Sequence, residues 1–272
     1  MDPITIITVC YNAEATIEQT ICSVLGQSYR PIEYIIIDGK STDNTNSIIL
    51  RYKPEFIEKG FNFLHISEQD KGIFDAMNKG IQLATGKWIN FMNAGDFFNN
   101  DEVIKQVFYR KIPVGVKAIY GDTIVSKRFG QFVNHALPPT QIVQHMPTCH
   151  QAFFIDAEEM KQHPFSNDYH LTADYHFVYN LYKRTSNQAF LQLPISIVCY
   201  EAEHGISSIN KLTVKKECAR IRNINNTWRW YFSYTHACVS LYTKALFNNV
   251  IPKNILMAVK RWNRKRLSNR HL

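Results

Sequence analysis

Apolar residues in the first hundred positions alternate between short β-branched runs and longer stretches with helical spacing. Ile4 to Val9 is a continuous β-branched run, which is typical of a buried strand. The next stretch, 15–26, is apolar at positions 17, 21, 24 and 25, the spacing of one helix face. The alternation then repeats, with strands predicted over 32–37, 61–67 and 87–92, one helix opening at 41–45 and another over 73–84.

Strands that alternate with helices predict a mostly parallel α/β sheet, flanked by helices, that binds ligands at the carboxyl ends of its strands. After Ala118–Asp122 the pattern becomes irregular, with a polar hairpin-like stretch over 123–133 and a proline-rich loop over 137–147. From Lys211 onward the sequence is helical in pattern, basic and rich in aromatic residues. We therefore expect an α/β domain over 1–210 and a helical appendage over 211–272.

Charge supports the same division. The chain has a formal net charge of +8, but residues 211–272 carry fourteen Lys and Arg and one acidic residue, Glu217. The first 210 residues hold 17 basic and 22 acidic residues, so the body is mildly acidic. A composition that is 45% hydrophobic is ample for a buried core and excludes intrinsic disorder.

The six cysteines form no C-x-x-C pair and show no tight spacing, which argues against a zinc module or a disulfide framework. The apolar start has no basic segment before it, so it reads as a strand rather than a signal peptide. These features indicate a cytoplasmic protein with reduced thiols.

Two acidic residues follow predicted strands at the edge where ligands would bind. Asp38 comes directly after the second strand, and Asp96 closes the Asn-Ala-Gly-Asp sequence after the fourth. One such carboxylate can accept a hydrogen bond from a base or ribose, and a second can hold a metal on a diphosphate. The alternative is that each aspartate caps the helix that follows it.

With these residues in this order, the sequence resembles family 2 of the inverting glycosyltransferases, which have the GT-A fold. The resemblance is dense over residues 4–100 and sparser to about 208. It implies a nucleotide-sugar-binding half over 1–100, an acceptor half over 101–210, and a UDP-sugar donor more readily than a GDP-sugar. The matching segments are Thr8–Asn12, Ile37–Thr45, Ser67–Gly80 and Asn93–Asp96, and then His150-Gln151, Ala173-Asp174 and Gly205–Ser208.

The resemblance also implies roles on the donor side. Tyr11 is expected to stack near the base, Asp38 to hydrogen-bond the base, and Asp70 and Asn78 to line the nucleoside pocket. A core position for Tyr11 and a helix-capping role for Asp70 and Asn78 stay open. The full set expected to bind the nucleotide sugar is Thr8, Tyr11, Asp38, Asp70, Asn78, Lys79, Asn93 and Asp96, with Lys71 a further diphosphate partner.

The metal motif departs from the family's pattern. Family members show two or three acids here, in the style of D-x-D, whereas this chain has Asn93 and a single acid, Asp96. Asp96 is thus expected to ligate Mn²⁺ or Mg²⁺ directly, since both cations prefer oxygen ligands. By the resemblance His204 completes the metal site, and His150 is the competing residue.

Asp174 is at the position of the family's general base, which removes the proton of the attacking hydroxyl. The alternative is a carboxylate held at a helix start by the macrodipole, and both can hold at once. His150 and Gln151 are expected on the acceptor or phosphate side of the site.

The basic tail interleaves cations with Trp and Tyr, a composition that suits an anionic membrane surface or a nucleic acid. Charged and polar residues interrupt the apolar stretch 228–251, which argues against a spanning helix. We expect peripheral attachment to the inner face of the cell membrane and no nucleic-acid partner. The alternative is a tail that packs on the domain with its cations directed outward.

The leading hypothesis is an enzyme that transfers a sugar with inversion to a lipid-linked glycan in O-antigen or capsule assembly. The rival is a non-catalytic nucleotide-sugar or nucleic-acid binding protein, suggested by the thinned metal motif and the basic tail. A sugar-phosphate nucleotidyltransferase lacks support because Thr8 to Ala13 is not glycine-rich. A dehydrogenase is excluded because no G-x-G-x-x-G follows the first strand.

Overall fold

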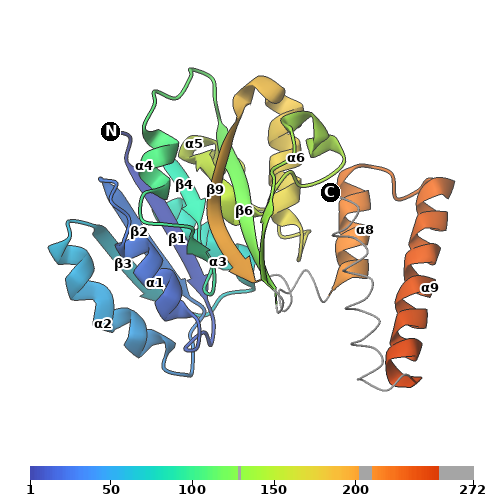
Figure 1. Ribbon diagram of the computed structural model, residues 1–272, viewed down its shortest axis with the longest axis horizontal. Helices are drawn as coiled ribbons and strands as arrows, with labels where there is room; N and C mark the ends of the chain where they lie inside the picture. The colour runs from blue at the N-terminus through green and yellow to red at the C-terminus, as the bar shows by residue number, and fades with distance from the viewer. Residues whose placement is uncertain (128–129, 202–209, 251–272) are drawn as a thin grey trace. The chain divides into compact units, whose positions relative to one another are not determined.

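The β-branched runs of the sequence form the centre of a sheet that carries helices on both faces (Figure 1). The computed structural model describes residues 1–127, 130–201 and 210–250. The first half alternates strand and helix in the predicted order. Its elements are β1 (Ile4–Cys10), α1 (Ile17–Leu25), β2 (Ile32–Asp38), α2 (Thr45–Glu58), β3 (Asn62–Ser67), α3 (Ile73–Leu83) and β4 (Trp88–Phe91).

The second half completes the sheet with longer and less regular elements. Its hairpin lies where the polar stretch predicted one, and its proline-rich loop contains a 3-10 helix. The strands are β5 (Phe97–Phe98), β6 (Ala118–Lys127), β7 (Gly130–Asn134), β8 (Phe153–Asp156) and β9 (Phe190–Glu201). The helices are α4 (Val103–Phe108), η1 (Pro139–Val143), η2 (His150–Ala152), α5 (Ala157–Gln162), α6 (Ala173–Thr185) and η3 (Asn187–Ala189).

Strand order along the sheet is β3-β2-β1-β4-β8-β6-β9-β5, with β7 paired to β6. The first four strands are parallel, as the alternation of strand and helix predicts. Cys10, Asp38 and Ser67, the last residues of three of them, are in register. β8 lies antiparallel between β4 and β6, and β5 pairs antiparallel with β9. The second half thus extends the parallel core as a mixed sheet.

The alternation of side chains along the strands divides the core into two layers. On β1, Ile4 and Ile6 pack in a cluster with α1, α2 and α4, whereas Ile7 and Val9 pack in a cluster with α3, α5 and α6. This is the period of two that strand geometry imposes. Gly80 lets α3 approach β1 closely, because a Cβ atom there would lie 2.6 Å from Ile7 Cγ2.

A buried carboxylate ties the amino end of the sheet together. Glu33 on β2 accepts hydrogen bonds from Thr5 Oγ1 at 2.6 Å and from Asn62 Nδ2 at 3.1 Å, on the two flanking strands. It also accepts from the backbone N–H and hydroxyl of Thr85, at 2.7 and 2.9 Å, just before β4. Four segments of the chain therefore share one acceptor.

The chain divides into two compact units, Met1–Asn210 and Lys211–Leu272. The described part of the second unit is a helical pair, α8 (Lys211–Ile221) and α9 (Trp228–Val250). Lys215 Nζ on α8 donates to the carbonyl oxygen of Ser233 on α9 at 2.7 Å. Within the ranges that the structure describes, no helix is both long and apolar enough to cross a bilayer.

We expect Glu33→Ala to lower the free energy of unfolding by about 3 kcal/mol, because several buried donors lose their acceptor. Glu55→Ala, on the exposed face of α2, is the matched control and should change it by less than about 0.5 kcal/mol. Urea unfolding of both variants measures this, and equal effects would contradict the role assigned to Glu33.

Candidate active site

An open pocket lies at the carboxyl ends of β1, β2 and β3, where ligands of a parallel sheet are expected. It has a volume of about 410 Å³ and is lined by Tyr11, Gly39, Lys40, Gln69 and Asp70. Tyr11 is 64% exposed, so it is not a core residue. Gly39 lies close to Asp70, since a Cβ atom at Gly39 would lie 2.5 Å from Asp70 Oδ2.

Asp38 is fully buried below this pocket and shapes the loop above it. Its Oδ2 accepts from the backbone N–H of Ser41 at 3.0 Å, from Asn46 Nδ2 at 2.8 Å and from Ser67 Oγ at 2.6 Å. Burial raises the pKa of Asp38, but these hydrogen bonds outweigh it and hold that pKa below its usual value. The ionised carboxylate thereby fixes the loop that carries Gly39 and Lys40.

Three residues expected on the nucleotide side are engaged within the protein. Thr8 is buried in the sheet and donates to the carbonyl oxygen of Met92 at 2.7 Å. Both amide atoms of Asn78 pair with the backbone of Phe165, each at 2.9 Å. Lys79 forms an ion pair with Glu68 at 2.8 Å. The structure does not place these three side chains on the lining of the pocket.

A second group of polar side chains gathers beyond the end of β4. Asp96 accepts a hydrogen bond from Gln151 Nε2 at 2.6 Å, which joins the Asn-Ala-Gly-Asp loop to η2. Thr20 on α1 holds this loop from below, since its hydroxyl donates to the Asp96 carbonyl at 2.8 Å and accepts from the Gly95 N–H at 2.9 Å. Gly95 has φ +100°, a backbone conformation that glycine adopts without strain, so glycine at this position allows the loop to turn.

His150 connects this loop to α6. Its Nε2 lies 2.9 Å from Asn93 Nδ2, and its Nδ1 lies 3.1 Å from Asp174 Oδ2. With the Asn93 amide oriented in this way, Nε2 accepts and the proton is on Nδ1, which donates to the aspartate. Five residues from three segments of the sequence therefore form one cluster: Asn93, Asp96, His150, Gln151 and Asp174.

The oxygen atoms of this cluster suit a hard divalent cation. Asn93 Oδ1 and Gln151 Oε1 are buried and have no hydrogen-bond partner among the described residues. Together with the Asp96 carboxylate they provide three oxygen donors, the ligand type that Mg²⁺ and Mn²⁺ prefer. The described residues contain no group of three His, Cys, Asp or Glu that could hold a metal, and His204 lies outside them. Diphosphate oxygens would have to complete such a site.

Asp96 is poised between its two protonation states. Burial raises its pKa to about 6, and the hydrogen bond from Gln151 and the proximity of His150 oppose this rise only in part. Perturbed carboxylates of this kind concentrate at functional sites. A nearby cation would favour the ionised form of Asp96 and would lower the free-energy cost of keeping that charge away from water.

Comparison with protein families identifies the family of the chain. Residues 5–188 match the family described as glycosyl transferase family 2. The chain belongs to glycosyl transferase family 2. This confirms the resemblance drawn from the sequence motifs.

Curated relatives of this family 2 chain include bacterial biosynthesis glycosyltransferases. It is 36% identical over 104 residues to the putative teichuronic acid biosynthesis glycosyltransferase TuaG of Bacillus subtilis, covering 38% of this chain and 40% of that protein. It is 29% identical over 147 residues to a PGL/p-HBAD biosynthesis glycosyltransferase of Mycobacterium bovis, covering 53% and 55%. The chain thus spans about half the length of the curated relatives it matches.

Solved structures confirm the GT-A fold class of this family 2 chain. Staphylococcus aureus TarS in complex with UDP matches with a TM-score of 0.63 at 15% identity, covering 83% of this chain and 65% of that one. The mannosyltransferase PcManGT of Pyrobaculum calidifontis, in complex with GDP-Man and Mn²⁺, also matches with a TM-score of 0.63 at 15% identity. That match covers 95% of this chain and 79% of the mannosyltransferase.

Some contributors to the site were missed at the level of sequence. Lys40 and Gln69 line the pocket although only their neighbours Asp38 and Asp70 were singled out. Both residues lie inside segments that match the family's motifs, and that position was the sequence signal that could have identified them. Thr20 had no signal, because a threonine between apolar residues on a helix reads as core.

We expect Asp96→Asn to raise the free energy of unfolding by about 1–3 kcal/mol at pH 8 in the absence of metal. A carboxyl with a raised pKa stabilises the fold only while protonated, so the wild-type chain loses stability as pH rises from about 4 to about 6. The gain from the variant should therefore vanish below about pH 4. Urea unfolding in chelator at several pH values measures it, and a gain that is independent of pH would contradict a raised pKa for Asp96.

Proposed function

We propose that the chain transfers one sugar, with inversion, from a UDP-sugar to a hydroxyl of a lipid-linked glycan during surface-polysaccharide assembly. The observation that carries this proposal is the pairing of two features at one sheet edge. The Tyr11–Asp70 pocket follows β1, β2 and β3, and the Asp96–Asp174 cluster follows the adjacent strand β4. A nucleotide in the pocket would direct its diphosphate and sugar toward the cluster. The relatives TarS, crystallised with UDP, and TuaG, named for teichuronic acid biosynthesis, support the donor and the pathway class.

On the donor side, the exposed ring of Tyr11 stacks on the base, and Asp70 hydrogen-bonds the nucleoside. Lys40, on the same rim, offers a positive charge for the diphosphate. Asp38 acts through the loop that it fixes, and Thr8, Asn78 and Lys79 act as supports of the sheet and of α3. These roles follow from the partners that each side chain already has.

On the metal side, Asp96, Asn93 and Gln151 would hold Mn²⁺ or Mg²⁺ together with the donor diphosphate. When bound, the cation neutralises the charge that develops on the departing nucleoside diphosphate. The amide oxygens of Asn93 and Gln151 would take the place of the second and third acids that other family members have at the metal site. The fit rests on the unpaired amide oxygens, and the Mn²⁺ complex of the mannosyltransferase supports it.

Asp174 accepts the proton of the acceptor hydroxyl. Its position in the first turn of α6 directs the carboxylate into the cluster, where His150 Nδ1–H holds one oxygen at 3.1 Å. Each carboxylate oxygen can accept a second hydrogen bond, so the acceptor hydroxyl can bind without displacing His150. His150 thereby positions the base, and Asn93 in turn positions His150.

The rival function is a nucleotide-sugar binding protein without turnover. It would keep the Tyr11 pocket but would not need a carboxylate held beside His150 in the adjacent cluster. Release of UDP from a UDP-sugar, measured with and without Mn²⁺, separates the two functions.

We expect Asp96→Ala to abolish transfer and to remove the Mn²⁺ dependence of donor binding, because it deletes the only carboxylate of the loop. Calorimetric donor titrations with and without Mn²⁺ measure the second effect. Near-normal transfer by this variant would place the metal elsewhere in the chain.

We expect Asp174→Asn to lower turnover by about 10² to 10⁴ while donor affinity stays the same, since a positioned base contributes that much and the amide keeps the shape. Asp168→Asn, in an exposed loop before α6, is the matched control and should leave turnover unchanged. Single-turnover kinetics at saturating donor decide the matter: normal chemistry in Asp174→Asn would remove Asp174 from the mechanism.

The helical tail would hold the enzyme at the inner face of the membrane. On α9, Trp228 and Phe232 are 75% exposed and Val239 is 61% exposed, an aromatic and aliphatic set that suits a lipid interface. Each basic residue near an anionic leaflet contributes about 1 kcal/mol, so part of the tail is sufficient for attachment.

We expect a chain lacking residues 211–272 to lose flotation with anionic vesicles, and salt to weaken binding of the full chain by screening. Neutral vesicles are the control. Flotation that survives both salt and truncation would contradict an electrostatic tail, and tight RNA binding by the full chain would favour the nucleic-acid alternative.

A further inference from the structure

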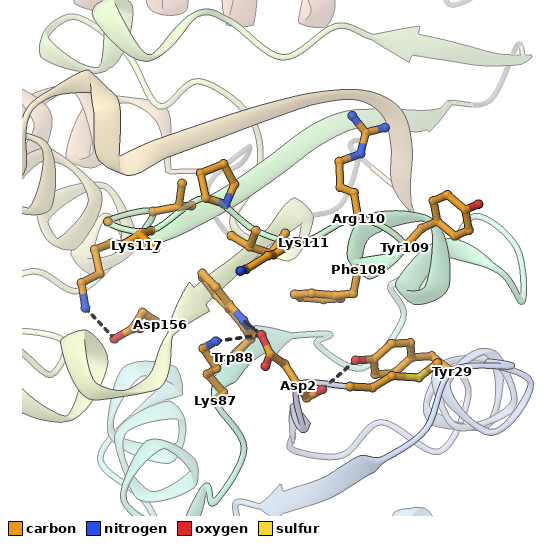
Figure 2. Close-up of a pocket in the computed structure, with 16 residues that line it drawn as sticks. Asp2, Tyr29, Lys87, Trp88, Phe108, Tyr109, Arg110, Lys111, Lys117 and Asp156 are labelled. Carbon is orange, nitrogen blue, oxygen red and sulfur yellow. Dashed lines mark hydrogen bonds and ion pairs between the residues drawn. The ribbon is translucent and has the colours of Figure 1, made fainter.

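A second hollow lies at the opposite edge of the sheet, beside the amino ends of β1 and β4 (Figure 2). It has a volume of about 530 Å³. Because β1 has seven residues, at about 3.3 Å each, this hollow is roughly 20 Å from the carboxyl edge. We call it the distal lysine pocket, and the residues that matter are Asp2, Lys87, Phe108, Lys111, Lys117 and Asp156.

The floor of the distal lysine pocket is held by specific contacts. Asp2 accepts from Lys87 Nζ at 2.8 Å and from Trp88 Nε1 at 3.3 Å. The hydroxyl of Tyr29 donates to the carbonyl oxygen of Asp2 at 2.7 Å. Phe108 packs against both Tyr29 and Trp88, with ring centroids 5.8 and 6.0 Å apart. These contacts hold Asp2, which pairs with the half-exposed Lys87.

The other wall is the loop between α4 and β6. It turns at Pro113–Val116, where Gly115 has φ +90°, and it rejoins the sheet at Lys117, whose N–H donates to the Ala189 carbonyl at 2.7 Å. Lys117 Nζ lies 3.3 Å from Asp156 Oδ1. Figure 2 shows Lys111 extending toward Trp88, whereas the Arg110 side chain points away from it.

The lining carries an excess of positive charge. Four of its residues are cations, Lys87, Arg110, Lys111 and Lys117, and its only acids are Asp2 and Asp156. Lys111 has no hydrogen bond or ion pair with any described residue. This excess stands out because the first 210 residues are acidic overall, with 22 acids and 17 bases.

The lysines of this pocket suit a small anion with several acceptor oxygens. Arginine and lysine both bind phosphate, arginine through its planar fork and lysine as a compact point charge with three donors. In this pocket the inward cations are lysines and the arginine points outward (Figure 2). Lys87 and Lys117 already pair with Asp2 and Asp156. A bound anion would therefore contact Lys111 first and would share Lys87 and Lys117 with those carboxylates.

We propose that the distal lysine pocket binds a phosphate group of a soluble ligand, either a free phosphate or a phosphodiester of a glycan. A phospholipid headgroup is disfavoured by its position. The preference for a soluble ligand rests on the function proposed above. A bilayer docked at this edge would hold the catalytic edge about 20 Å from the lipid-linked acceptor. An extended glycan phosphate, in contrast, could contact both edges in solution.

The test uses the full chain and calorimetric titration with two soluble probes, inorganic phosphate and a short glycerol phosphate oligomer. Lys111→Gln keeps the length of the side chain and removes its charge. We expect it to weaken binding by about tenfold, the effect of one charge-assisted hydrogen bond. Arg110→Gln, one position away on the same loop, is the matched control and should weaken it less than twofold. Tighter binding of the oligomer than of inorganic phosphate would assign the phosphate to a glycan, and the reverse would assign it to a free anion.

Three outcomes would overturn the proposal. These are no binding of either probe, equal losses in the two variants, and a Lys111 effect seen only with phosphatidylglycerol vesicles. A UDP titration of the same variants is run separately, and we expect neither substitution to change UDP affinity. Failure of UDP to bind the unmodified chain would count against the proposed transferase and not against the distal lysine pocket.

Discussion

The burial of one ionised carboxylate at the end of β2 determines how the pocket with Tyr11 and Asp70 is built. Asp38 can stay charged there only because four hydrogen bonds from Ser41, Asn46 and Ser67 replace its lost water. Those donors come from the following loop, from α2 and from β3. Satisfying the carboxylate therefore fixes the ends of β2 and β3 and the loop between them. The open pocket with Tyr11 and Asp70 rests on that arrangement.

The Asp96 cluster follows the opposite rule, because its partly buried carboxylate receives few hydrogen bonds. Asp96 receives one hydrogen bond from Gln151, and burial raises its pKa to about 6. The neighbouring oxygens of Asn93 and Gln151 are likewise buried and unpaired. Native interiors rarely tolerate such groups, and those that persist are commonly functional. These unpaired groups therefore lower the stability of the fold, and a bound cation would offset that loss.

Residue patterns predicted the parallel half of the sheet because β1 and β2 are buried apolar runs and a helix follows each of β1, β2 and β3. The mixed half was not predictable in detail, since β8 lies between β4 and β6 through pairings 33 to 68 residues apart in sequence. Motifs located the loops of the site but not the direction of each side chain. Thr8 shares the parity of Ile4 and Ile6, so it points into the core rather than toward the pocket. Asn78 pairs with Phe165, 87 residues away, and no local pattern could show that.

The central claim is that one edge of the sheet binds a nucleotide sugar and activates it with a divalent cation. Its most direct test is the release of UDP or GDP from a panel of UDP- and GDP-sugars by the full chain, measured in Mn²⁺ and in chelator. The account predicts release of UDP from at least one UDP-sugar in Mn²⁺ and a loss of that release in chelator. Absence of release from every donor, or release at the same rate in chelator, would contradict it.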